Sequence, residues 1–357
     1  MSETLEARAE ILKLSRLLGQ DAEAFAYLDG MPSVEIRLLR EQITDVLFTV
    51  HGPALSRLAT ASRLLPVALV ATLGEKVFGP VLSARVAGLL EPGRAVEMAS
   101  RLPISFLADV AIELDPRRAS EVIGRIPPEQ IAAITRELIG QEEYVTMGRF
   151  VGHLSQDAIV SAVAAIDDTA LLRIAFVLES KDSLKDLVGV LPGVRLDGIV
   201  EAAANANLWP EVLDLLGHLT LTQRRELVQR ASAWDEGRTL GALLDAARTQ
   251  NMWAELLPLI VLLPDDGRER VAGLVSSLEL DDEAVQEIAT AVLEHDLWEP
   301  VLIIANSLQD ADLARVAERL AEPVAAMDPV EREAIAERAR AAGLMDRLGP
   351  LSVVLDG

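Results

Sequence analysis

Apolar residues recur every three or four positions along almost the whole chain, in short runs separated by proline, glycine or acidic residues. This spacing places apolar side chains on one face of a helix, and the separating residues are typical of helix ends. Runs of alternating valine, threonine and tyrosine bounded by Asn-Gly or Asp-Gly are almost absent. The pattern therefore predicts an all-α protein of many short helices.

One stretch of this pattern occurs twice, 24 residues apart. Leu90-Glu-Pro-Gly-Arg-Ala95 is repeated as Leu114-Asp-Pro-Arg-Arg-Ala119, and the Arg-x-Pro that follows is repeated as well. Each copy predicts a short helix that stops at a proline, and then a second helix at residues 104–113 or 128–138. A unit this short cannot bury its own apolar face, so it must stack on further copies.

A longer period follows beyond residue 195. Its anchors are 44, 45 and 47 residues apart: Leu208-Trp209, Met252-Trp253, Leu297-Trp298 and Leu344-Met345. An alanine-rich helix precedes each anchor, and apolar residues follow three and six positions after it. This period fits about three short helices, as in armadillo and HEAT-type units. We therefore expect a right-handed α-solenoid of 24-residue units followed by 44–47-residue units.

The expected organisation has three segments. Residues 1–50 form an N-terminal helical cap, residues 51–192 form the shorter repeats, and residues 193–357 form HEAT/armadillo-like repeats continuous with them. A joint is expected near residues 192–197. The helices between residues 54 and 90 contain few polar residues and are expected to be more enclosed than the rest. The outer face of the cap is assigned to the charged residues Glu3, Glu6, Arg8 and Glu10.

The segment Leu90 to Leu138 resembles a known family. Its sequence, LEPGRAVEMASRLPISFLADVAIELDPRRASEVIGRIPPEQIAAITREL, is similar to the helical repeats of the intracellular N-terminal domain of MgtE-type magnesium transporters, which are related to the middle domain of the flagellar motor protein FliG. The likeness extends over about residues 60–190. It implies an acidic α-solenoid that works by docking. The regulatory domains and membrane pore of that family have no counterpart here, so no metal-binding residue is transferred.

Composition and charge exclude several kinds of partner and chemistry. Half of the residues are hydrophobic but only 3% are aromatic, so leucine, valine, isoleucine and alanine must form the core. A net charge of −23 repels nucleic acids and anionic lipid, so neither is an expected partner. The absence of cysteine excludes disulfides and thiolate chemistry. The start lacks a signal-peptide pattern, which predicts a cytoplasmic protein. The runs Leu64 to Gly74 and Leu256 to Pro264 are too short to span a membrane.

Three tryptophans recur at the longer period and are candidate binding residues: Trp209, Trp253 and Trp298. A row of aromatic side chains can line a groove for a partner helix or an apolar ligand. Alternatively, each indole fills the gap between successive units, with its N–H bonded to a nearby acceptor.

A second candidate group has a spacing of three residues, close to one helix face: Tyr144, Met147, Phe150 and His153. Residue types that are scarce in this chain gather here. They can line an apolar pocket with two polar tips, suited to a sterol-like, isoprenoid or fatty-acyl molecule, or pack in the core with their tips at the surface.

Catalytic and metal-binding motifs are weak. Asp265, Asp266 and Glu269 form a DDxxE, the kind of spacing with which carboxylates share Mg²⁺ in prenyl-diphosphate enzymes. Pro264 and Gly267 place this cluster at a helix start, where carboxylates accept backbone N–H groups. The four histidines are scattered, and no phosphate-binding loop or serine nucleophile elbow is present. No catalytic residue, cofactor or metal ligand is therefore assigned.

The first functional hypothesis is a non-enzymatic cytoplasmic scaffold or adaptor that binds basic surface patches or helices of other proteins. A homo-oligomer is compatible with such a surface. The alternative is a carrier or sensor that encloses an apolar small molecule, favoured by the mean hydropathy of +0.27. A closed apolar cavity of at least about 300 Å³ would support that alternative. A cavity enzyme of unknown reaction is the third hypothesis.

Overall fold

The computed structural model describes residues 2–50, 52–233, 238–276, 280–306 and 308–356. Helices make up 79% of the structure, and the described residues contain no strand, which confirms the all-α class.

The chain divides into two compact units, which we describe separately. The N-terminal unit is Glu3–Leu191 and the C-terminal unit begins at Pro192. The joint expected near residues 192–197 begins at this border.

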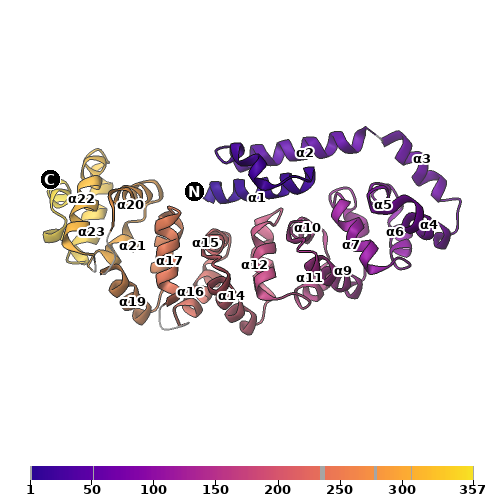
Figure 1. The fold of residues 1–357 in the computed structure, drawn as a ribbon. Helices are drawn as coiled ribbons and strands as arrows, with labels where there is room; N and C mark the ends of the chain where they lie inside the picture. Colours follow the sequence, from indigo (N-terminus) through magenta and orange to yellow (C-terminus); the bar gives the residue numbers. More distant parts are fainter. Residues whose placement is uncertain (1, 51, 234–237, 277–279, 307, 357) are drawn as a thin grey trace. The chain divides into compact units, whose positions relative to one another are not determined.

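The N-terminal unit is a series of short helices stacked along the chain (Figure 1). Its helical elements are α1 (Ser2–Leu18), η1 (Ala22–Leu28), α2 (Ser33–Thr49), α3 (Gly52–Ser62), α4 (Val67–Leu73), η2 (Gly74–Phe78), α5 (Gly79–Ala87), α6 (Pro92–Ala99), α7 (Ile104–Glu113), α8 (Ser120–Ile123), α9 (Pro128–Gly140), α10 (Tyr144–Phe150), η3 (Val151–His153), α11 (Gln156–Val163), α12 (Asp168–Phe176), η4 (Lys181–Ser183) and α13 (Leu184–Gly189). From α3 onward, helices contact the helix two positions further on: α3 with α5, α4 with α6, α5 with α7, α7 with α9, and α9 with α11. The apolar faces are thus buried between successive helices.

Each of the two 24-residue copies forms the expected pair of helices, α6 with α7 and α8 with α9. Their first helices differ. The carboxylate of Glu91 accepts two backbone N–H groups of the first turn of α6, at 3.0 and 2.9 Å. The equivalent Asp115 accepts one backbone N–H, that of Arg117 at 3.1 Å, and also pairs with the side chains of Arg117 and Arg118, at 3.2 and 3.4 Å. Helix α8 is correspondingly short, with four residues.

One arginine of each copy ties that copy to an earlier helix. Arg94 donates from Nη2 to two carbonyl oxygens at the end of α3, both at 2.6 Å. Arg118, the equivalent residue, donates to Asp45 on α2 at 2.7 Å. Its guanidinium also lies 4.0 Å from the ring centre of Phe48. The same sequence position therefore makes the same kind of backward connection in both copies.

Helices α1 and α2 form a hairpin that lies along the side of this row (Figure 1). Arg40 on α2 reaches Glu179 after α12, whereas Asp45, further along α2, reaches Arg118 before α8. The hairpin therefore runs opposite to the row, and α3 starts the row at the far end. The hairpin has a core of its own, formed by Ala7, Ile11, Leu14, Leu28 and Ile36.

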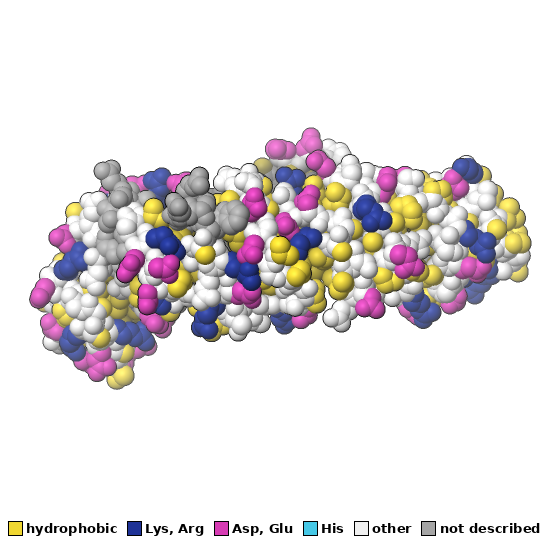
Figure 2. Space-filling view, turned by 90° about the horizontal axis from the view of Figure 1, so that it is seen from below, with side chains coloured by type: hydrophobic (Ala, Val, Ile, Leu, Met, Phe, Trp, Pro, Cys, Tyr) yellow, Lys and Arg dark blue, Asp and Glu magenta, His cyan; other side chains and the backbone are white. Residues whose placement is uncertain are grey.

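The helices between residues 54 and 90 are largely exposed, which corrects the expectation that they are enclosed. Because α3, α4 and α5 stand at the end of the row, they have helices to pack against on one side only. We call the exposed large apolar residues here the apolar end: Leu64, Leu65, Leu69, Val77, Phe78 and Val81. Apolar side chains are visible at this end of the unit, on the right of Figure 2.

One helical run in the described residues is, by length and composition alone, long and apolar enough to cross a membrane. It is Val67–Ala87, with a hydropathy of 1.4, and it joins α4, the π-helical turn η2 and α5. The run is not straight, because Gly79 has φ +72° and ψ 178° and Pro80 follows it. The φ and ψ of Gly79 are not those of a helix, so the helix axis changes direction between α4 and α5.

The C-terminal unit repeats the same packing with longer helices. Its helical elements are α14 (Gly193–Ala206), α15 (Trp209–Gly217), α16 (Leu221–Ala233), α17 (Arg238–Thr249), α18 (Trp253–Ile260), α19 (Asp265–Ser276), α20 (Asp282–His295), α21 (Trp298–Ala305), α22 (Asp310–Ala325), α23 (Pro329–Ala341), η6 (Met345–Arg347) and α24 (Pro350–Asp356). The even-numbered helices α14 to α24 contact one another in order, and so do the odd-numbered helices α15 to α23. Helices α15, α18 and α21, three positions apart, also contact one another in order.

A left-handed residue ends several helices in both units. The residues with positive φ at these ends are Gly19, Glu142, Asn207, Asn251, Asp296 and Gly343. In each case the next backbone N–H donates to the carbonyl oxygen five residues earlier, at 2.8 to 3.1 Å. This 6→1 bond is that of the Schellman motif, which satisfies carbonyl groups left free at a helix end. Only glycine adopts this conformation without steric cost, and asparagine and aspartate tolerate it better than other residues.

We predict that Glu142→Gly stabilises the protein by about 0.5–1 kcal/mol, because Glu142 has φ +56° and a side chain that is exposed. The urea midpoint followed by far-ultraviolet circular dichroism measures the effect. The matched control is Gln141→Gly, where φ is −98° and glycine should destabilise. Equal destabilisation by both variants would contradict the argument.

Candidate functional site

The candidate group around Tyr144 does not converge on one pocket. Tyr144, Met147 and Phe150 share α10, and Met147 is buried. The Tyr144 hydroxyl accepts a hydrogen bond from Arg173 of α12 at 3.4 Å. The Nδ1 atom of His153 lies 3.1 Å from a serine hydroxyl of α8. The two polar tips therefore contact different neighbouring helices.

The tryptophan series is buried. Trp209, Trp253 and Trp298 begin α15, α18 and α21, and each is at most 4% exposed. The indole N–H of Trp253 donates to Oε2 of Glu287 at 3.3 Å. These side chains fill the space between successive helices, so none of the three lines an open groove.

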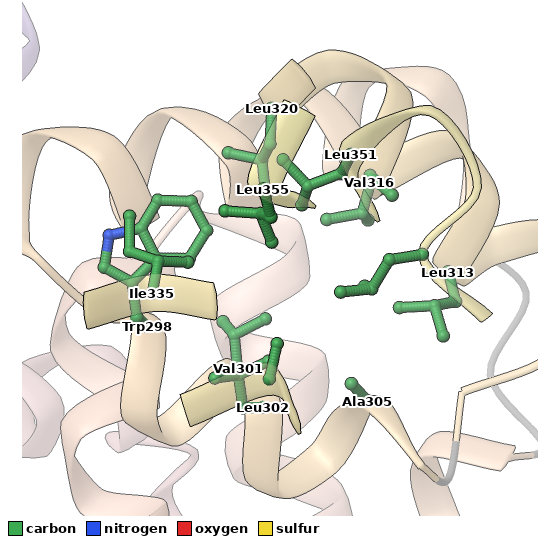
Figure 3. A pocket seen from close by; sticks show the side chains of 13 residues that line it. Trp298, Val301, Leu302, Ala305, Leu313, Val316, Leu320, Ile335, Leu351 and Leu355 are labelled. Atoms are coloured by element: carbon green, nitrogen blue, oxygen red, sulfur yellow. The ribbon is translucent and has the colours of Figure 1, made fainter. Parts of the chain in front are cut away.

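Trp298 also lines a small cavity between α21, α22, α23 and α24 (Figure 3). Side chains such as Val301, Leu313, Leu320 and Leu351 point into it and make the wall apolar. Its volume is about 20 Å³. Ligand pockets require about 300 Å³ or more, and a single water needs about 10–15 Å³. This cavity is therefore a packing gap and cannot enclose a lipid.

The acidic cluster noted in the sequence lies at a helix start, as do Asp167 and Asp281. Asp265 and Asp266 open α19 and pair with the two arginines of the following turn, at 3.5 and 3.0 Å. Asp167 and Asp281 accept the backbone N–H of the third following residue, at 2.7 and 2.8 Å. Carboxylates in these positions cap helices and complement the helix dipole.

A different set of carboxylates lies on two neighbouring helices of the C-terminal unit. Helices α20 and α22 pack side by side and are joined by the ion pair of Arg315 with Asp282 at 2.8 Å. We define the acidic face as Asp282, Glu283 and Glu287 on α20 and Glu318 and Glu322 on α22. Glu283, Glu318 and Glu322 are exposed and make no ion pair with any residue that the structure describes.

Glu287 is the least favourably placed member of this face. Burial raises the pKa of its carboxyl, and repulsion from Glu283 and Asp281 adds to the shift, while the hydrogen bond from Trp253 opposes it. Glu283 and Glu287 are four residues apart on one helix, where like charges destabilise. The charge at Glu287 therefore costs folding stability.

Five charged residues form a network between the N-terminal hairpin and the row: Glu10, Lys13 and Arg40, which are buried, and Arg37 and Glu179, which are partly exposed. Lys13 donates from Nζ to Glu10 Oε1 at 2.8 Å and to the carbonyl oxygen of Leu178 at 3.1 Å. Arg40 bridges the two carboxylates, donating to Glu10 Oε2 at 3.2 Å and pairing with Glu179. Glu10 and Lys13 are only 1% and 2% exposed. The network thus joins α1, α2 and the segment after α12.

Burial and opposite charges have opposing effects on the pKa values of Glu179 and Lys13. Burial would raise the pKa of Glu179, but Lys13 and Arg40 outweigh it and hold that pKa below its ordinary value. Burial lowers the pKa of Lys13, against the opposing effect of Glu10 and Glu179. A buried charge is tolerated only when it is paired and hydrogen-bonded, so each member depends on the others.

A second contact supports the same docking. Arg16 at the end of α1 donates from Nε and Nη2 to the two carboxylate oxygens of Glu143, at 2.9 and 2.7 Å. The hydroxyl of Thr146 donates to the same carboxylate at 2.8 Å. This bidentate geometry fixes orientation as well as distance.

Glu10 was expected on the outer face of a cap, and the structure corrects this: its side chain is buried in the network. The network itself was not predicted. One signal was available: Ala7, Ala9 and Ile11 put apolar residues on more than one side of α1. A helix that is apolar all round is a buried helix, so charges within it need partners. The partners themselves are distant in the sequence and could not be identified from it.

Comparison with known proteins gave no match: no family model, no curated protein and no solved structure matches this chain.

Replacing Lys13 by methionine should destabilise the protein by about 3 kcal/mol or more, because it leaves Glu10 and a backbone carbonyl underpartnered. Arg101→Gln, which breaks the exposed pair with Glu97 at 3.1 Å, is the control and should cost less than about 0.5 kcal/mol. The urea midpoint by circular dichroism measures both. A Lys13→Met effect as small as the control would show that the network does not hold the fold.

Stability should fall as the pH drops below about 4.5, in part through Glu179. The pKa of Glu179 lies below its ordinary value of 4.5, so its contribution is present above that pH and is lost as the pH falls towards the folded-state pKa. Thermal melting across this range measures the slope. Glu179→Gln should flatten it, and an unchanged slope in that variant would contradict the assignment.

Proposed function

We propose that the chain is a non-enzymatic α-solenoid binding protein that acts as a scaffold or adaptor, docking a basic surface or helix of another protein on the acidic face of α20 and α22. The observation that carries this proposal is that Glu283, Glu318 and Glu322 are exposed and make no ion pair with any residue that the structure describes. Glu287 lies one helical turn after Glu283. Its carboxylate is partly buried beside like charges, and its pKa is raised, so it opposes folding. A basic partner would supply the missing counter-charge, which makes a binding role the best account of this residue.

The charge distribution supports the same partner class. Residues 192–357 contain 30 aspartates and glutamates against 14 lysines and arginines. Negative charge is therefore concentrated in the C-terminal unit, where it attracts cationic partners and raises the rate of encounter. Exposed carboxylates on neighbouring helices, as on α20 and α22, suit the repeated positive charges of a basic helix.

The solenoid architecture with units of 44–47 residues is part of this proposal. The left-handed residues Asn207, Asn251, Asp296 and Gly343 are 44, 45 and 47 residues apart, each two positions before the start of the next helix or turn. The contacts of α15 with α18 and of α18 with α21 join helices at equivalent positions of such repeats. The resemblance to the MgtE-type N-terminal domain and the cytoplasmic location remain predictions that accompany the scaffold hypothesis.

The carrier alternative has less support. The cavity beside Trp298 is about 20 Å³, and the apolar helices near residues 64–81 face outward instead of surrounding a chamber. An enclosed apolar ligand would need space that these two features do not provide.

Glu287→Gln should raise stability at neutral pH and at the same time weaken binding to a basic partner. The pKa of Glu287 is raised, so its favourable contribution is present at acidic pH and lost as the pH rises through that pKa; glutamine removes the loss while keeping an acceptor for Trp253. A fluorescent amphipathic Lys/Leu peptide is the binding probe, measured by anisotropy. Its affinity should fall about two- to fivefold in the variant and also as salt rises.

The control is Glu201→Gln, at an exposed position of α14 in the same unit, which should leave both properties nearly unchanged. Unchanged peptide affinity in Glu287→Gln, or an equal loss in Glu201→Gln, would show that the acidic face is not the docking site.

A further inference from the structure

The apolar end of the N-terminal unit is a surface with few hydrogen-bonding side chains. Its six members are leucine, valine and phenylalanine, and Leu64 is 86% exposed. They follow the turn after α3 and the outer sides of α4, η2 and α5. Between them the exposed polar side chains are Thr72 and Lys76. Such a surface has little with which to recognise a specific polar partner, whereas it can enter an apolar medium.

Positive charge surrounds this surface, in contrast to the rest of the chain. Residues 52–103 contain six lysines and arginines against three glutamates, although the whole chain has a net charge of −23. Exposed Arg57 lies on α3, which ends at Ser62, two residues before Leu64. Exposed Arg63 is the immediate neighbour of Leu64.

The three glutamates of this region are already engaged. Glu75 pairs with Lys76, Glu97 pairs with Arg101, and Glu91 caps α6, where backbone N–H groups lower its pKa. Arg57 and Arg63 form no ion pair with any part of the chain that the structure describes, although the charge of Arg63 is close enough to Glu91 to help lower its pKa. Cationic charge is thus left available directly beside exposed leucines. Because exposed charges are screened beyond about 8 Å at physiological salt, this local charge matters more than the distant acidic residues.

We propose that the apolar end binds the surface of an anionic lipid bilayer, with the leucines and Phe78 in the interfacial region and Arg57 and Arg63 at the phosphate groups. This combination of a one-sided apolar helix face and flanking cations is that of interfacial membrane helices. It also assigns a different partner to each unit: lipid to the apolar end of the N-terminal unit and a basic protein to the C-terminal unit.

The helices lie on the bilayer and do not cross it. The inward residues Val70, Ala71 and Ala84 are buried where α4 packs on α6 and α5 packs on α7. The bend at Gly79 also prevents α4 and α5 from forming the straight helix of about 30 Å that spanning requires. Only the outer face is therefore available to lipid.

Flotation of the full chain with vesicles tests this proposal. One set of vesicles contains phosphatidylcholine alone, and the other contains phosphatidylcholine with phosphatidylglycerol. The protein should float with the anionic vesicles and much less with the neutral ones, and binding should weaken as salt rises. Leu69→Glu should abolish binding, and Arg63→Glu should lower the partition coefficient about tenfold on anionic vesicles.

Val330→Glu is the matched control, because Val330 is equally apolar and 78% exposed but lies in the C-terminal unit. It should bind vesicles like the unchanged protein, and circular dichroism should show that all variants are folded. Absence of flotation, or flotation that Leu69→Glu leaves intact, overturns the proposal.

Sedimentation velocity tests the competing occupant, a second copy of the chain. A dimer that Leu69→Glu converts to a monomer, without vesicle binding, would assign the apolar end to that second copy. Neither result would bear on the acidic face, whose test uses different residues.

Discussion

The buried contact between Glu10, Lys13, Arg40 and Glu179 determines where the first 50 residues of this protein lie. The hairpin of α1 and α2 has its own apolar core, so it does not need the row in order to bury its leucines. Its buried charges, however, need the partners that the row provides, because a buried ion without its partner is strongly destabilising. We infer that the network contributes specificity of placement more than net stability, as buried polar groups do in some other proteins.

This placement has a consequence at the other end of the unit. Because α2 runs back along the row, α3 to α5 begin the row without a polar helix outside them. Repeat proteins ordinarily cover their terminal unit with a polar face. Here the end remains apolar and is flanked by arginines such as Arg57 and Arg63. The position of the hairpin and the exposed surface at the apolar end are therefore parts of one arrangement.

Local features of the fold could be predicted from sequence because their causes are local. The helix at Ile104–Glu113 and the caps at Asp167 and Asp281 follow from residues a few positions apart. Burial of the tryptophans agrees with one of the two alternatives that their spacing left open. The wrong expectations concern tertiary placement: the exposure of residues 54–90 and the burial of Glu10 depend on which helix is the neighbour. Hydropathy alone cannot distinguish an enclosed apolar helix from an unpartnered one. The sequence shows an excess of negative charge but not its location on α20 and α22, because these two helices come together only in the folded chain.

The measurement that tests this account most directly is a double-mutant cycle between α2 and the end of α12. Urea unfolding would be compared for Arg40→Met, Glu179→Gln and the double variant. If the network holds the hairpin on the row, the two changes are coupled by more than about 1 kcal/mol, and the double variant is less destabilised than the sum of the single ones. Additive effects within about 0.3–0.5 kcal/mol would show that the two residues do not act together, and the account of the hairpin would be wrong.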